Sequence, residues 1–420
     1  MRRRTLAIII AAVVVVAVLV VGVVRAGAQG TPNLPSITVG QLLQNVATKA
    51  HDTTALSGEF SWSNDLLGAG SLVSLGGSGG GGPSASLASV LNGGSGRVWL
   101  QDGKARIESQ SDNGNGDVVA VTNGQTAWVW QAATNTATEY TLPSGAGATA
   151  SPSPAPSFDP ATAISRLIDR LAPTAKLEVS GQAVVAGQDT YTLTLTPTSP
   201  LTTFGSITVA IDGHHWVPLQ VQVFAKGATK PVVSAGFTSV SYAPVSDGLF
   251  TFTPPSGATV VHKDLSNGLQ GLRTPGAGQE TPRIAGAKHV PLTLDQAKAR
   301  APFLLTPSST PAGLDFKGAF VTPTGSGKQA HPPVAVLHYG TGFGSVFVVE
   351  TPATAAQDKA VEQRLGQLSL LGKADVNGVP AIKLQTALGS ALTFRQGDVR
   401  VVVAGIVPWS DLQQVAVGLQ

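Results

Sequence analysis

Two adjacent histidines, His214 and His215, lie beside Trp216 and close to Asp212 in the stretch AIDGHHWVPLQVQVF. Imidazole and carboxylate groups at this spacing could hold a metal ion or transfer protons. In a strand, however, neighbouring side chains point to opposite faces, so the two histidines could not easily share one ion. Alternating apolar residues flank the stretch on both sides. It therefore predicts a hairpin whose tip, from Asp212 to Trp216, exposes the histidines to solvent.

The other residues suited to chemistry form no recognisable constellation. The remaining histidines are scattered singly, and the chain has no cysteine. The letters GGSGG at 76–80 match the serine-nucleophile motif, but they lie inside a glycine tract and not at a strand-to-helix turn. TGSGKQ at 324–329 lacks the first glycine of a phosphate loop. We therefore predict a protein that is not an enzyme, with no catalytic residue, no metal site and no cofactor.

An apolar run near the N-terminus indicates where the chain resides. Leu6 to Val24 is uncharged and follows three arginines, and its 19 residues suffice to cross a bilayer core of about 30 Å. The positive-inside rule keeps the N-terminus in the cytoplasm and sends the rest outward. A cleaved signal peptide is the alternative, since AGA at 26–28 resembles a cleavage site before Gln29. Either way the bulk of the chain is expected outside the cytoplasm, anchored in the membrane through residues 6–24 or secreted after cleavage near Ala28.

Composition and charge exclude one class of partner. Hydrophobic residues make up 42% of the chain and charged residues only 12%. The formal net charge is +3, and four arginines flank the apolar run, so the remainder carries −1. No basic stripe with interleaved aromatic residues remains, and nucleic acid is therefore not expected as a partner.

Alternation of apolar and polar residues predicts strands over most of the chain. DTYTLTLTP at 189–197 places leucines on one face and threonines on the other, as in a half-buried antiparallel strand. The dipeptides Asp102-Gly103 and Asn123-Gly124 predict type I′ hairpin turns. The strands at 205–227, 230–244 and 248–261 are expected to complete a meander.

Helices are predicted at four places along the chain. They begin near Thr38, Asp159, Thr293 and Pro408. Thr38 and Asp159 suit the N-cap position, because their side-chain oxygens can accept hydrogen bonds from free amides of the first turn.

The fold class is therefore α+β, and breaks in the patterns divide the chain. The predicted parts are a transmembrane anchor or signal peptide (1–28), a linker (29–36), a sheet domain (37–261) with flexible insertions at 65–96 and 143–157, a second linker (262–290) and a smaller α+β domain (291–420).

Large apolar side chains on the predicted strands could form an ordinary core or line a cavity for a lipid-like ligand. The candidates for such a cavity are Phe60, Trp62, Trp99, Trp128, Trp130, Tyr191, Leu193, Leu195, Val221 and Val223. Which face each residue occupies depends on strand register, and a shift of one residue would invert it.

The order of motifs over residues 37–261 resembles the LolA/LppX/RseB superfamily of bacterial envelope proteins. The motifs are VTNGQTAWVW, VSGQAVVAGQDTYTLTLTP, ITVAIDGHHWVPLQVQVF and FTFTPPSGATVV. The resemblance implies a strongly curved antiparallel sheet, an unclosed barrel, whose hollow is covered by helices. Residues after 290 resemble a small domain that accompanies some Gram-positive members.

The same resemblance implies a binding function. Members of the superfamily carry lipids or lipoproteins in the hollow, or sense envelope stress by binding a lipoprotein or an anti-sigma factor. We therefore expect a membrane-anchored protein that holds the acyl chain of a lipid or lipoprotein. The alternative is an RseB-type regulator that binds a membrane protein such as an anti-sigma factor.

Overall fold

The computed structural model describes residues 32–66, 93–111, 117–142, 172–264, 291–322, 332–353 and 371–420, together with residues 169 and 359. The predicted apolar segment at 6–24, the predicted helix from Asp159, most of the two predicted insertions and most of the predicted linker at 262–290 lie outside this part. Within it, no helix is long and apolar enough to cross a membrane.

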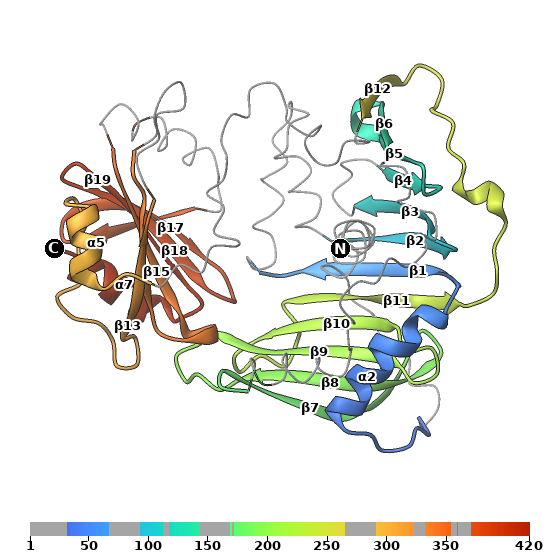
Figure 1. The fold of residues 1–420 in the computed structure, drawn as a ribbon, viewed down its shortest axis with the longest axis horizontal. Coiled ribbons are helices and arrows are strands. Elements are labelled where there is room, and N and C mark those ends of the chain that lie inside the picture. Colours follow the sequence, from blue (N-terminus) through green and yellow to red (C-terminus); the bar gives the residue numbers. More distant parts are fainter. Residues whose placement is uncertain are drawn as a thin grey trace, which may run out of the picture.

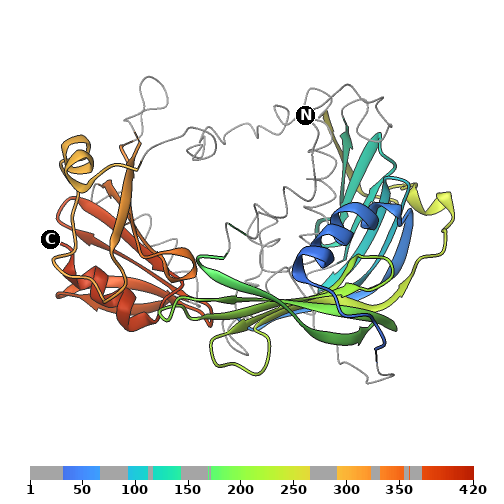
Figure 2. The ribbon, with the colours of Figure 1, turned by 60° about the horizontal axis from the view of Figure 1, so that its bottom comes forward.

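Most of the described chain is sheet, and its larger sheet has twelve strands in the order β12-β6-β5-β4-β3-β2-β1-β11-β10-β9-β8-β7 (Figure 1). The strands are β1 (Ala55–Asn64), β2 (Gly94–Gln101), β3 (Lys104–Ser111), β4 (Val118–Thr122), β5 (Thr126–Gln131), β6 (Thr136–Thr141), β7 (Ala175–Val185), β8 (Gln188–Pro197), β9 (Phe204–Asp212), β10 (Pro218–Ala225), β11 (Val233–Ser241) and β12 (Thr259–Asp264). The sheet is unclosed and bends, as Figure 2 shows, which agrees with the curved sheet expected from the sequence.

The predicted meander is wrong at its last strand. After β11 the chain forms a short 3₁₀ helix, η4 (Asp247–Phe250), and then runs irregularly through Pro254 and Pro255. Proline has no amide proton to give to a strand ladder, so this stretch does not pair beside β11. It continues instead to the far edge of the sheet, where β12 pairs with β6 in parallel.

Helix α2 (Val39–Lys49) begins where the sequence predicts. The Thr38 hydroxyl accepts a hydrogen bond from the Gln41 amide at 3.2 Å, and the Gln41 side chain accepts one from the Thr38 amide at 2.8 Å. Two amides of the first turn are satisfied by this reciprocal capping box.

One of the two predicted type I′ turns is confirmed. Asp102 and Gly103 both have positive φ, 49° and 77°, as this turn requires. At the second site only Gly124 has positive φ. There the Asn123 side chain accepts hydrogen bonds from the amides of Gln125 and Thr126, both at 2.9 Å, and this local bonding sets a longer turn.

The smaller sheet has seven described strands in the order β13-β14-β15-β19-β18-β17-β16. They are β13 (Phe316–Val321), β14 (Ala335–Tyr339), β15 (Val346–Pro352), β16 (Gly372–Val376), β17 (Val379–Gln385), β18 (Ser390–Gln396) and β19 (Val399–Gly405). Helices α5 (Leu294–Arg300) and α7 (Trp409–Gly418), both predicted, contribute to one large apolar core with the sheet.

A short loop of the larger sheet joins the two units. Leu201 packs against the core of the smaller unit. Thr203 donates hydrogen bonds from its amide to the Ile406 carbonyl at 3.1 Å and from its hydroxyl to the Leu388 carbonyl at 2.7 Å. Phe204 stacks on Phe343 with ring centroids 5.0 Å apart. The loop between β8 and β9 therefore fixes how the units sit together.

Leu201→Asp should loosen this joint, because a carboxylate cannot remain in the apolar core without a large desolvation cost. We expect a larger radius of gyration by small-angle X-ray scattering, with the strand content unchanged by circular dichroism. Thr196→Asp, an exposed change on neighbouring β8, is the matched control. An unchanged radius for Leu201→Asp would contradict this role of the loop.

Candidate functional site

Strand register divides the larger sheet into two chemically different faces. Leu193, Val209, Val221, Ala235 and Trp62 are cross-strand neighbours from β8 to β1, so their side chains share a face. Helix α2 packs on the same face, which we call the helix face. Figure 2 shows α2 lying inside the bend of the sheet.

Helix α2 is anchored at one end of the helix face. Leu42 is fully buried against Tyr191 and Ile211. The Tyr191 hydroxyl donates to the Pro35 carbonyl at 2.8 Å, and the Trp216 ring stacks on Tyr191 at 6.1 Å between centroids. These contacts hold the helix over β8 and β9.

An aromatic pair lies further along the helix face, on β1. Phe60 and Trp62 stack with centroids 5.8 Å apart. Neighbouring β2 carries Gly94 and Gly96 opposite them, and a Cβ atom at either glycine would come within 2.6 Å of the Trp62 or the Phe60 ring. The two rings therefore cover the glycines of the next strand, a cross-strand pairing that helps to fix strand register. The alternating glycines of GSGRVW are the sequence signal for this unpredicted arrangement.

Between α2 and the aromatic pair the helix face is apolar, and it is only half-buried except at positions such as Val233 and Ala235 of β11, which are buried. Leu193, Leu195, Val221 and Val223 are all intermediate in exposure. In contrast with the large core of the smaller unit, the described core of this sheet forms three clusters of three buried residues each. The helix face thus offers apolar surface that the described residues do not fully cover.

Seven of the ten candidate residues share the helix face, and three do not. By the same register Trp99, Trp128 and Trp130 point to the opposite face of the sheet. Trp128 lies against Phe252 at 5.5 Å, and the Trp130 indole donates to the Asn135 side chain at 3.3 Å. The ten residues therefore do not line one surface, because neighbouring strands pair Trp99 with Arg106 and not with the aromatic pair of β1.

The hairpin tip at Asp212 is a structural turn. Asp212 is fully buried, and one carboxylate oxygen accepts the amides of His214 and His215, both at 2.7 Å. The other oxygen accepts the Tyr242 hydroxyl at 2.7 Å. Trp216 adopts the left-handed φ of 61° that lets the chain reverse. The carboxylate thus replaces backbone partners that the turn lacks.

The expected exposure of both histidines is only half right. His214 is exposed, but the His215 ring stacks on Tyr242 at 3.5 Å and is half-buried. The sequence does not predict this contact, because Tyr242 is distant from His215 along the chain. Burial, together with the hydrogen bond and the charge of Asp212, raises the pKa of Tyr242 well above its ordinary value. The hydroxyl therefore stays a donor to Asp212 at neutral pH. Among the described residues, no group of three histidine or carboxylate side chains is placed to hold a metal ion.

No family model matches the sequence, and no curated protein matches it. Solved structures do match. They include MucB and LolA superfamily proteins. MucB in complex with MucA(peri) is 16% identical over 90% of this chain and 97% of that chain, with a TM-score of 0.37. The MucA/MucB complex of Pseudomonas aeruginosa is 16% identical over 90% of this chain and 96% of that chain, with a TM-score of 0.35.

A LolA superfamily protein from Nitrosomonas europaea is 10% identical over 52% of this chain and 99% of that chain, with a TM-score of 0.19. The superpositions are loose. The chemical character of the site is therefore given by the residues of this chain on the two faces of its sheet. The helix face is the apolar one and bears α2.

Proposed function

We propose that this chain is an extracytoplasmic, membrane-anchored binding protein that holds an acyl chain of a lipid or lipoprotein on its helix face. One observation carries the proposal: strand register gathers seven large apolar candidates on the face that bears α2, and leaves five of them half-buried. The apolar run at 6–24 supports the anchored location.

Burial alone supplies the binding energy in this mechanism. Each methylene group removed from water contributes about 0.8 kcal/mol, so an acyl chain needs only a continuous apolar surface and no covalent step. The row from Leu193 to Trp62 crosses five strands side by side. Since neighbouring strands lie about 4.8 Å apart, the row is about 20 Å long, which matches an extended acyl chain.

Val221→Asp should weaken the uptake of a fluorescent fatty acid at least about tenfold, because a carboxylate on the helix face must be desolvated when the acyl chain binds. Titration of the purified protein with the probe measures the affinity. A denaturant titration of the same sample checks that the variant is folded.

Gln222→Asp is the matched control. It introduces the same carboxylate one residue along β10, where the side chain points to the opposite face. We expect this variant to bind the probe like the unmodified protein. Equal affinities for the two variants, or no saturable binding by the unmodified protein, would refute the assignment of the helix face.

A regulator that binds a membrane protein is the second candidate function, favoured by one observation on the smaller unit. Phe347 is 42% exposed, on the sheet face away from α5 and α7, where it stacks on His338 at 4.7 Å. An exposed aromatic residue of this kind suits a protein interface. Co-purification of a single-span membrane protein that is lost with Phe347→Ser would favour this candidate, and its retention would disfavour it.

A further inference from the structure

The face of the larger sheet opposite to α2 carries a polar groove with no part in the function proposed above. Two adjoining hollows of about 380 and 510 Å³ lie over β1, β2, β3 and β11 and share Glu59 and Arg97. We call them together the outer groove. A register shift between Glu59 and Phe60, where β1 pairs with β11, distorts the sheet at this point. Such bulges recur beside functional sites.

Small hydroxyl side chains form much of the groove, and a tryptophan lies in each hollow. The serines and threonine whose side chains can line it are Ser57, Ser61, Ser95, Thr238, Ser239 and Ser241, whereas Ser109 shares the helix face with Phe60 by register. Trp99 belongs to one hollow and Trp130 to the other, and both rings are half-buried. The Arg97 guanidinium lies 5.5 Å from the centre of the Trp99 ring. The groove thus combines flat aromatic surface with many hydrogen-bonding groups.

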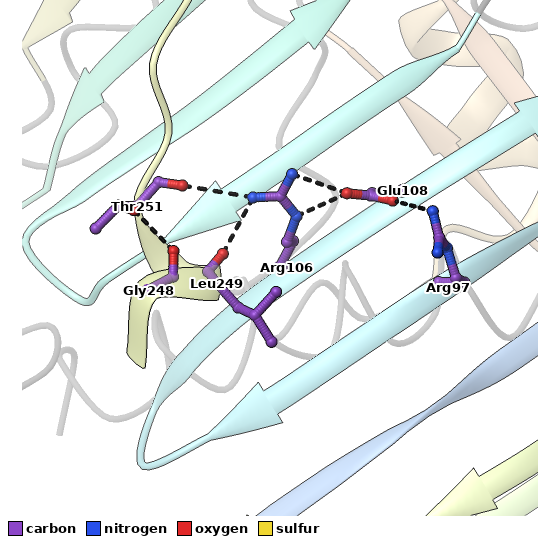
Figure 3. A network of polar contacts seen from close by, with 6 residues as sticks. All are labelled: Arg97, Arg106, Glu108, Gly248, Leu249 and Thr251. Atoms are coloured by element: carbon purple, nitrogen blue, oxygen red, sulfur yellow. Dashed lines mark hydrogen bonds and ion pairs between the residues drawn. The ribbon is translucent and has the colours of Figure 1, made fainter. Parts of the chain in front are cut away.

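An ion-pair network holds two charged side chains of the groove, Arg97 and Glu108 (Figure 3). Glu108 accepts hydrogen bonds from Arg97 at 2.9 Å and from Arg106 at 2.8 Å. Arg106 also donates to the carbonyls of Leu249 at 3.1 Å and Thr251 at 3.4 Å. Segment 248–251 therefore holds Arg106, and Arg106 in turn orients Glu108 toward the groove.

The charge of the groove excludes two classes of ligand. The lining contains Arg97 against three carboxylates, Glu59, Glu108 and Asp117, so it carries net negative formal charge. An anionic ligand such as a nucleic acid or a phosphate would be repelled. An acyl chain offers no hydrogen-bonding group, so its binding would remove water from the serines and carboxylates of the lining without replacing the lost hydrogen bonds, which is costly. A neutral ligand rich in hydroxyl groups fits both conditions.

We propose that the outer groove binds a neutral oligosaccharide. The C–H face of a pyranose ring can lie on an indole, while sugar hydroxyls exchange hydrogen bonds with carboxylates, guanidinium and serine hydroxyls. Hydrogen bonds to charged side chains are the stronger ones, so Glu59 and Arg97, shared by both hollows, are the main polar contacts. This function is independent of acyl-chain binding on the helix face.

Isothermal titration of the full-length chain in a non-glycosidic detergent tests the proposal. The probes are cellotriose, maltotriose and tri-N-acetylchitotriose. At least one of them should bind saturably at one site per chain. Arg97→Ala and Glu59→Gln, both at exposed positions, should each weaken this binding about tenfold.

Lys104→Ala is the matched control, since Lys104 lies on the same face of β3 but outside the groove, where it pairs with Asp247. It should bind the sugar unchanged, and so should Val221→Asp on the helix face. Absence of binding to all three sugars up to about 10 mM, or binding that neither Arg97→Ala nor Glu59→Gln weakens, would overturn the proposal. Loss of acyl-chain binding alone would leave it standing.

Discussion

Asp212→Ala is expected to lower the free energy of unfolding by about 3–5 kcal/mol. The carboxylate is fully buried and accepts hydrogen bonds from the amides of His214 and His215 and from the hydroxyl of Tyr242. Alanine would leave these donors without their partner and remove the group that holds the turn before β10. Urea unfolding of the purified protein measures the change.

Two further variants separate this network from a general effect of losing a carboxylate. Tyr242→Phe removes one hydrogen bond to the buried carboxylate and should cost about 1.5–3 kcal/mol. Asp247→Ala removes a surface ion pair with Lys104 and should change stability by less than about 0.5 kcal/mol. If Asp212→Ala were no more destabilising than Asp247→Ala, the turn would not depend on the buried carboxylate.

Glu350 should make the smaller unit less stable as the pH rises from about 4.5 to 7. The side chain is fully buried on β15, and one oxygen accepts the Leu305 amide at 2.7 Å, while the other has no partner among the described residues. Burial raises the pKa of Glu350 from 4.5 to about 7. The folded state therefore holds a proton that the unfolded state has released across this interval.

The consequence for stability has a definite sign and size. Where the folded state binds the extra proton, stability falls with rising pH, by about 1.4 kcal/mol per pH unit. The unit should lose about 3 kcal/mol between pH 4.5 and 8, most of it before pH 7 and the remainder as the folded-state carboxyl ionises around its own pKa. Urea titrations at several pH values in this range measure the loss, with unfolding of the smaller unit monitored by the protection of residues 291–420 from proteolysis.

Glu350→Gln should remove this pH dependence, because the amide keeps an acceptor for the Leu305 amide and cannot ionise. Asp398→Asn, at an exposed position of the same unit, should leave the dependence in place. If the unfolding free energy of Glu350→Gln still fell with rising pH, a group other than Glu350 would be responsible for the pH dependence.

Local patterns in the sequence were sufficient to predict most of the described helices and strands. Alternation located the strands, and Thr38 and Thr293 marked the starts of α2 and α5 because an N-cap depends on a few adjacent residues. The path of residues 242–264 was not predictable in this way. Its strand pairs with β6, which lies more than a hundred residues earlier in the chain, and no local signal encodes that partner.

The candidate site was predictable only in part for the same reason. Tyr191, Leu193 and Leu195 share a face by simple alternation within one strand. Whether Trp62 and Trp99 share a face depends on how β1 pairs with β2, and the register places Trp99 opposite Ser57. The buried role of Asp212 depends on Tyr242, which β11 brings to the turn from a distant position in the sequence.

The most direct test of acyl-chain binding is to identify what the helix face carries. Residues 29–420 would be exported, purified without detergent, extracted with organic solvent and analysed by mass spectrometry. We predict a stoichiometric lipid or acyl chain that is absent from folded Val221→Asp and present in Gln222→Asp. A protein that yields no lipid and takes up none when it is added would contradict the claim and would identify the helix face as ordinary core.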